Sequence, residues 1–122
     1  MSVTSGTSDS PAVTLARAHM AAWANHDLDT ARGNVADDVQ FFGNDQSTVG
    51  IQAYMDGLAR FTEQFVPGSL RIIATRGDER TAMILAEVTV GGQPFPSART
   101  LELDENGKIK VERVIFFQPP SA

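Results

Sequence analysis

The second half of the chain carries four strand-like segments separated by short turns. Each segment is rich in the apolar and β-branched residues that are typical of strands. The segments cover residues 69–76, 81–90, 95–103 and 109–117. Gly, Asp and Asn recur in the turns, and Asn106-Gly107 supplies the positive backbone angles that a tight hairpin turn needs. Strands joined by such turns pair antiparallel, so this half predicts a meander.

The first half shows helical periodicity instead. Ser10 and Pro11 provide a capping hydroxyl and a proline at the first helical position. Helices are predicted over residues 11–26, 27–36 and 49–65, with an extended segment over 39–42 and a loop over 43–47. Asp37 and Asp38 are interpreted as part of a turn, where aspartate hydrogen-bonds to its own backbone. About three N-terminal helices followed by long strands indicate an α+β fold, with the helices packed on one face of a curved, mainly antiparallel sheet.

Length and composition exclude several classes of protein. The 122 residues suffice for one domain, predicted over residues 10–122 after a disordered tail over 1–9. A net charge of −5 argues against partners such as nucleic acid or an anionic membrane surface. Cysteine is absent and the two histidines lie seven residues apart, so no metal site is expected. Without a signal peptide or a membrane-spanning run, we expect a cytoplasmic protein.

Three stretches of the chain resemble the nuclear-transport-factor-2-like superfamily, and within it the SnoaL-like polyketide cyclases and ketosteroid isomerases. They are "AAWANHDLDTARGNVADDVQFF" (21–42), "GIQAYMDGL" (50–58) and "DENGKIKVERVIFF" (104–117). The similarity extends over nearly the whole chain from about residue 11. It implies a cone-shaped α+β barrel whose strongly curved sheet encloses a pocket, often in a homodimer formed through the sheet. Members include isomerases, cyclases, epoxide hydrolases and binding proteins, so the fold does not decide the function.

The isomerase groups are missing at the matching positions. The tyrosine of the first helix falls on His19, the carboxylate base at or near Gly43, and the protonated aspartate on Arg99. Since glycine cannot accept a proton, a ketosteroid isomerase is not expected, although Asp45 could reach back from the following loop. The pocket positions of the last strand fall on Glu112, Val114 and Phe116. The aspartate of a limonene-type epoxide hydrolase would fall on Val114, which cannot activate water.

His19 and Arg99 are polar residues on otherwise apolar faces. His19 could be a neutral histidine of the core, or it could line the pocket as a proton carrier. Arg99 alternates with apolar residues, and a charge on the inner face of a sheet needs a partner. Glu112 is expected roughly opposite Arg99, as a structural ion pair or as an acid/base pair for a ligand oxygen. Arg113 should then point outward, whereas the face of Glu87 depends on the strand register.

These residues define two hypotheses. The first is a SnoaL-like pocket that binds a small apolar, oxygenated molecule of polyketide or steroid type, with proton transfer that needs no cofactor. His19, Asp45, Arg99 and Glu112 are its candidate catalytic residues. Its candidate ligand-binding residues are Trp23, Phe41, Tyr54, Leu58, Phe61, Leu101, Val114 and Phe116. The second is a non-catalytic, dimeric interaction or ligand-binding module whose pocket is small, vestigial or filled by Trp23, Phe61 and Phe116.

Overall fold

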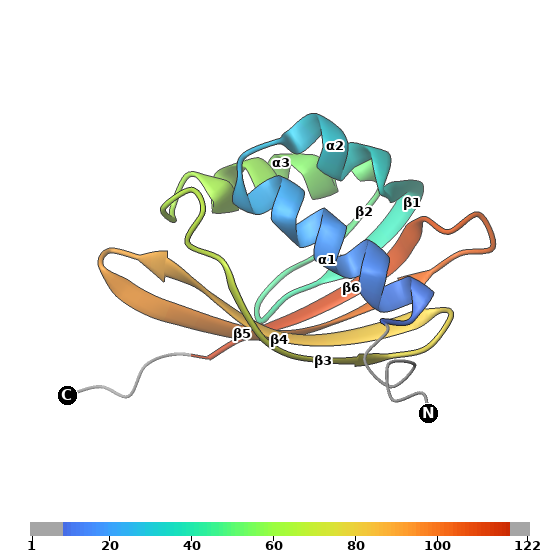
Figure 1. Cartoon of the computed structure of the whole chain (residues 1–122). Helices are drawn as coiled ribbons and strands as arrows, with labels where there is room; N and C mark the ends of the chain where they lie inside the picture. Colours follow the sequence, from blue (N-terminus) through green and yellow to red (C-terminus); the bar gives the residue numbers. More distant parts are fainter. Residues whose placement is uncertain (1–8, 118–122) are drawn as a thin grey trace, which may run out of the picture.

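A computed structural model describes residues 9–117, in which three helices lie on one face of a six-stranded sheet (Figure 1). The helices are α1 (Pro11–Ala24), α2 (Leu28–Gly33) and α3 (Ile51–Thr62). The strands are β1 (Val35–Phe42), β2 (Ser47–Val49), β3 (Arg71–Gly77), β4 (Thr81–Val90), β5 (Gln93–Leu103) and β6 (Ile109–Phe116). The α+β class is therefore confirmed.

The sheet is strongly curved and open. Its order is β2-β1-β6-β5-β4-β3, which leaves β2 and β3 as separate edges, so the cone does not close into a complete barrel. All neighbouring strands are antiparallel except β1 and β6, which are parallel. The predicted meander is present as β3 to β6. The long helices cover the concave side of the sheet, with α1 against β3, β4 and β5 and α3 against β1 and β2 (Figure 1).

The region around the first strand differs from the prediction. Asp37 and Asp38 do not form a turn: β1 begins at Val35, and both aspartates are exposed on it. The register against β6 shifts between Val35 and Gln40, so the aspartates lie in an irregular, bulged part of the strand. The loop predicted over 43–47 is shorter, because Ser47 begins β2, a strand too short and polar to give a periodic signal.

The helix starts follow the predicted capping chemistry. The Ser10 hydroxyl accepts a hydrogen bond from the Val13 amide at 3.3 Å, and an Asp27 carboxylate oxygen accepts one from the Thr30 amide at 3.2 Å. The third helix begins later than predicted, because Gly50 has a φ of 100° that a helix cannot contain. It also ends earlier, at Thr62, although Phe65 is still buried in the core.

The main core lies between α1 and the concave face of the sheet. The buried face of α1 is rich in alanine, so the helix backbone can approach β3, β4 and β5 closely. A Cβ atom at Gly77 would lie only 2.7 Å from Cγ2 of Val13 and 2.5 Å from the carbonyl oxygen of Thr81. The hairpin end of β3 therefore packs against the start of α1 without room for a side chain.

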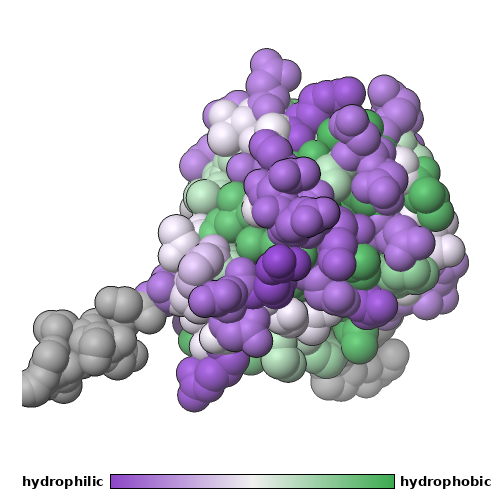
Figure 2. All heavy atoms as spheres, turned by 90° about the vertical axis from the view of Figure 1, so that its right-hand side faces the viewer, coloured by the Kyte–Doolittle hydropathy of each residue, from purple (hydrophilic) through white to green (hydrophobic). Residues whose placement is uncertain are grey.

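The first residue described, Asp9, forms a 2.8 Å ion pair with Arg17. The rest of the tail predicted over 1–9 lies outside the described residues, as do residues 118–122. No helix within residues 9–117 is long and apolar enough to cross a membrane. Hydrophilic side chains dominate the end of the molecule that carries the β3–β4 and β5–β6 turns, with small apolar areas scattered among them (Figure 2).

Candidate functional site

A cavity of about 340 Å³ lies between α3 and the concave face of β5 and β6. Four phenylalanines form most of its apolar wall: Phe41, Phe61, Phe95 and Phe116. Leu58 and Val114 also line it, as do three polar residues that are buried in the core, Tyr54, Arg99 and Glu112. Apolar walls with a few convergent polar groups are typical of small-molecule sites, and the volume is at the lower end of their usual range.

The polar groups form one continuous hydrogen-bonded cluster, which we call the buried polar cluster. Tyr54 donates its hydroxyl hydrogen to Oε1 of Glu112 at 2.5 Å, and Nη1 of Arg99 donates to Oε2 at 2.7 Å. Nε2 of His19 lies 2.8 Å from the Tyr54 hydroxyl oxygen. The cluster thus connects α1, α3, β5 and β6 through side chains that are all less than a tenth exposed.

Arg99 and Glu112 form the expected ion pair, but they are diagonal neighbours in the sheet. Glu112 lies opposite Leu101, whereas Arg99 lies opposite Val114. The side chains are 4% and 2% exposed, so each charge depends on the other for compensation. Arg99 also lies over the ring of Trp23, with 5.2 Å between Cζ and the ring centroid.

The hydrogen bonds determine which nitrogen of His19 carries its proton. Because Glu112 is paired with Arg99, it is ionised and can only accept, so the Tyr54 hydroxyl must donate to it. The Tyr54 oxygen then accepts from His19, which must carry its hydrogen on Nε2. The other ring nitrogen, Nδ1, is buried as well.

Burial keeps the imidazole and the phenol of this cluster neutral. Desolvation and, to a smaller extent, the charge of Arg99 lower the pKa of His19 to about 4, against the opposing effects of Glu112 and the Ala31 backbone. Desolvation also raises the pKa of Tyr54 well above 10, helped by the negative charge of Glu112 and opposed by Arg99. Near neutral pH His19 is therefore a neutral imidazole and Tyr54 a phenol.

Six of the eight expected ligand-binding residues line the cavity: Phe41, Tyr54, Leu58, Phe61, Val114 and Phe116. The other two, Trp23 and Leu101, belong to the core beneath it and are each 1% exposed.

The four residues expected to be catalytic lie at different positions relative to the cavity. Arg99 and Glu112 line the cavity, whereas His19 is fully buried and connects to it through the Tyr54 hydroxyl. Asp45 lies exposed in the β1–β2 loop and does not line the cavity. Gly43, the position of the isomerase base, borders the outer face of the sheet.

Several lining residues were not anticipated. Phe95 shares the inner face of β5 with Ser97 and Arg99, and this alternation could have revealed it. Gln46 and Thr48 come from the β1–β2 hairpin, whose second strand was missed. The remaining ones, Ala53, Gly57, Arg60 and Gln64, lie at helical spacing along α3 and its C-terminal end.

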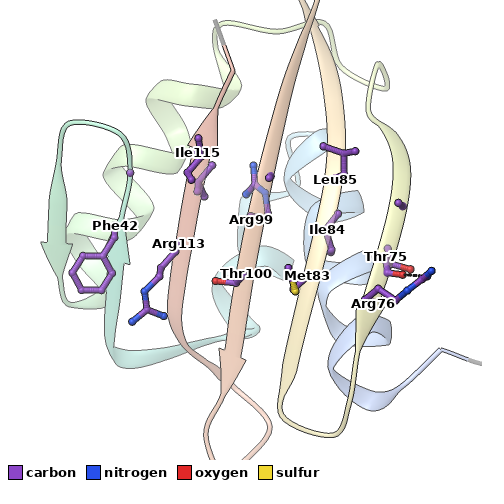
Figure 3. Close-up of a pocket in the computed structure, with 14 residues that line it drawn as sticks. Phe42, Thr75, Arg76, Met83, Ile84, Leu85, Arg99, Thr100, Arg113 and Ile115 are labelled. Carbon is purple, nitrogen blue, oxygen red and sulfur yellow. Dashed lines mark hydrogen bonds between the residues drawn. The ribbon is translucent and has the colours of Figure 1, made fainter.

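The convex face of the sheet carries a second, shallower hollow of about 700 Å³ (Figure 3). Phe42, Met83 and Ile115 are among its lining residues, and they are 38%, 56% and 58% exposed. Arg113 points to this side as expected, where it pairs with Glu102 at 2.6 Å and lies over the Phe42 ring. Glu87 lies opposite Pro96, away from Arg99, and its 3.4 Å ion pair is with Arg71.

No three His, Asp or Glu side chains within residues 9–117 come together in a group that could hold a metal ion. The site that the structure presents is thus an apolar cavity with the buried polar cluster at its base.

The family model of the SnoaL-like domain matches residues 16–112. This range includes most of the fold and the complete buried polar cluster. The chain belongs to the SnoaL-like domain family, as its sequence indicated. No protein of curated function matches it.

Solved structures support the same fold. A protein from Kribbella flavida is 27% identical with a TM-score of 0.79, over 85% of this chain and 84% of that one. A candidate ketosteroid isomerase from the same organism is 18% identical with a TM-score of 0.73, over 92% and 84%. A candidate SnoaL-like polyketide cyclase from Shewanella denitrificans is 16% identical with a TM-score of 0.74, over 87% and 90%. At these identities the last two show the fold alone.

Proposed function

We propose that the chain binds a small, mostly apolar molecule whose carbonyl or hydroxyl oxygen points toward the buried polar cluster. The observation that supports this proposal is the cavity itself, which combines four phenylalanine rings with Tyr54, Arg99 and Glu112 at one end. An apolar molecule gains free energy from burial among the rings. Its oxygen is oriented by a hydrogen bond from Arg99, because arginine has several N–H donors whereas the Tyr54 hydroxyl already donates its one hydrogen to Glu112.

Binding of 2-naphthol, measured by calorimetry, tests this proposal. A Leu58→Trp substitution should abolish binding, because the larger ring occupies the cavity that Leu58 lines. Tyr54→Phe should weaken binding up to about tenfold, because it removes the hydrogen bond that holds Glu112 in place beside Arg99. Val66→Trp is the matched control, since Val66 is 53% exposed and lies outside the cavity. Equal binding to the wild type and to Leu58→Trp would contradict the proposal.

The same geometry would serve proton transfer at a carbon next to a carbonyl, without a cofactor. Glu112 would accept the proton, and Arg99 would donate hydrogen bonds to the enolate oxygen, while the Tyr54 hydroxyl keeps its hydrogen bond to Glu112. NMR can follow the exchange of the α-protons of 2-tetralone in D₂O. A catalyst should accelerate this exchange, and Glu112→Gln should remove the acceleration. If 2-tetralone binds but exchanges at the rate of buffer alone, the protein is a non-catalytic binding module.

We also propose that the convex face of the sheet forms a homodimer. Phe42, Met83 and Ile115 leave apolar area exposed around a hollow on this face. A two-fold symmetric contact would bury the same residues from both copies. Light scattering should give twice the chain mass for the wild type and for Val66→Glu, and the mass of one chain for Ile115→Glu. A wild-type monomer at micromolar concentration would exclude the dimer.

A further inference from the structure

Arg60 lies at the open side of the cavity. It belongs to a stripe of α3 residues that face the cavity, with Ala53 and Gly57 preceding it. A Cβ atom at Gly57 would lie 3.9 Å from Nη2 of Arg60, so the guanidinium is folded back along the helix over that glycine. The side chain therefore extends along the cavity rather than straight into solvent.

The charges that line the cavity do not balance. Arg99 and Glu112 neutralise each other at 2.7 Å, and Arg60 is the remaining charged residue in the lining. No aspartate or glutamate within residues 9–117 forms an ion pair with Arg60. The cavity thus has a net positive charge in a chain whose net charge is −5. This excess favours a ligand with one negative charge.

Thr48 gives a second, independent indication of a polar ligand group. Its hydroxyl oxygen is buried without a hydrogen-bond partner among the described residues, and Thr48 lines the same cavity. A buried hydroxyl without a partner costs free energy that a ligand atom could recover. Gln46 and Gln64 also line the cavity, and their amides can donate further hydrogen bonds.

We infer that the natural ligand is an amphipathic monoanion, with an apolar ring body among the phenylalanines and a carboxylate that accepts hydrogen bonds from Arg60. This inference rests on the proposed function of the cavity and specifies its ligand class. A carboxylate suits the planar guanidinium, which can donate two parallel hydrogen bonds to it. The single charge matches the single uncompensated arginine of the lining.

The test compares 2-naphthoate with 2-naphthamide, which has nearly the same shape but no charge. Calorimetry should show tighter binding of 2-naphthoate to the wild type, and this preference should shrink as salt is raised. Arg60→Gln should weaken 2-naphthoate binding up to about fivefold, the upper range for an exposed ion pair, and leave 2-naphthamide binding unchanged. Arg32→Gln is the matched control, because Arg32 is exposed on α2 and does not line the cavity.

Each outcome separates the two proposals. Equal affinity of the wild type for both compounds, together with loss of both in Leu58→Trp, would retain the cavity as a binding site and overturn the anion preference. An equal loss in Arg60→Gln and Arg32→Gln would overturn the assignment to Arg60, because it would reflect the overall charge. If neither compound binds the wild type and 2-naphthol does not bind either, the proposed function and this inference both fail.

Discussion

Tyr54 connects the two halves of the candidate site. Its hydroxyl accepts from His19 and donates to Glu112, so one atom joins residues of α1 and β6. The sequence predicted that Arg99 and Glu112 would pair, because strand alternation places both on the inner face. It did not predict the role of Tyr54, since helical periodicity shows which face is buried but not which strand residue that face meets.

His19 should make the stability of the protein depend on pH. Its pKa is about 4 in the folded chain and about 6.5 when unfolded, so the unfolded state binds the extra proton between these values. The contribution of neutral His19 to the free energy of unfolding is fully present above pH 6.5, and it is lost as the pH drops toward 4. The wild type should lose about 3 kcal/mol more than His19→Gln between pH 7 and 4, since each pKa unit corresponds to about 1.4 kcal/mol.

Urea unfolding at a series of pH values would measure this difference. His26→Gln is the control, because His26 is exposed and outside the buried polar cluster, and it should retain the wild-type pH dependence. Identical pH profiles for the wild type and His19→Gln would show that the imidazole is not held neutral by its surroundings.

The β3–β4 hairpin and α1 depend on each other for packing. The β3–β4 hairpin was predictable, because the apolar residues of its strands and the residues of its turn are local signals in the sequence. The bounds of β4 are those predicted. The start of β1 and the whole of β2 were not predictable. The start of β1 depends on pairing with a strand far along the chain, such as Val35 with Ile109, of which a local segment carries no sign. β2 pairs only with the neighbouring β1 and is too short and polar to give a strand pattern.

Gly77 should tolerate no side chain. Gly77→Ala should lower the free energy of unfolding by about 1–3 kcal/mol, because the added methyl group would meet the Thr81 carbonyl and Val13. Gly33→Ala is the matched control. Nothing lies within 4 Å of a Cβ atom there and its φ is not positive, so the variant should be unchanged or up to about 1 kcal/mol more stable. Urea unfolding of both variants would check this, and equal stability would contradict the close packing.

At the scale of the whole molecule, the helices and the sheet share one core. Trp23, the single tryptophan of the chain, packs edge-on against Phe61 and Phe65 on one side and lies under Arg99 of β5 on the other. Neither layer can bury its apolar face without the other, so we expect a single cooperative transition.

Two probes should therefore give the same urea midpoint. Fluorescence reports the surroundings of Trp23, and far-ultraviolet circular dichroism reports the backbone of both layers. Coincident curves are expected for the wild type. A fluorescence change at clearly lower urea would mean that α1 separates from the sheet while the meander remains folded.

The position of β6 has a consequence for folding during synthesis. Within residues 9–117 it is the last strand to be translated, yet it lies between β1 and β5 and joins the two parts of the sheet. Until residues 109–116 leave the ribosome, β1 and β2 cannot pair with the meander. The apolar residues of β1 and of β5 that β6 later covers are then still exposed. The same strand carries Glu112, Val114 and Phe116 into the cavity. Completion of the sheet and the ability to bind a ligand should therefore arise together, in one late step.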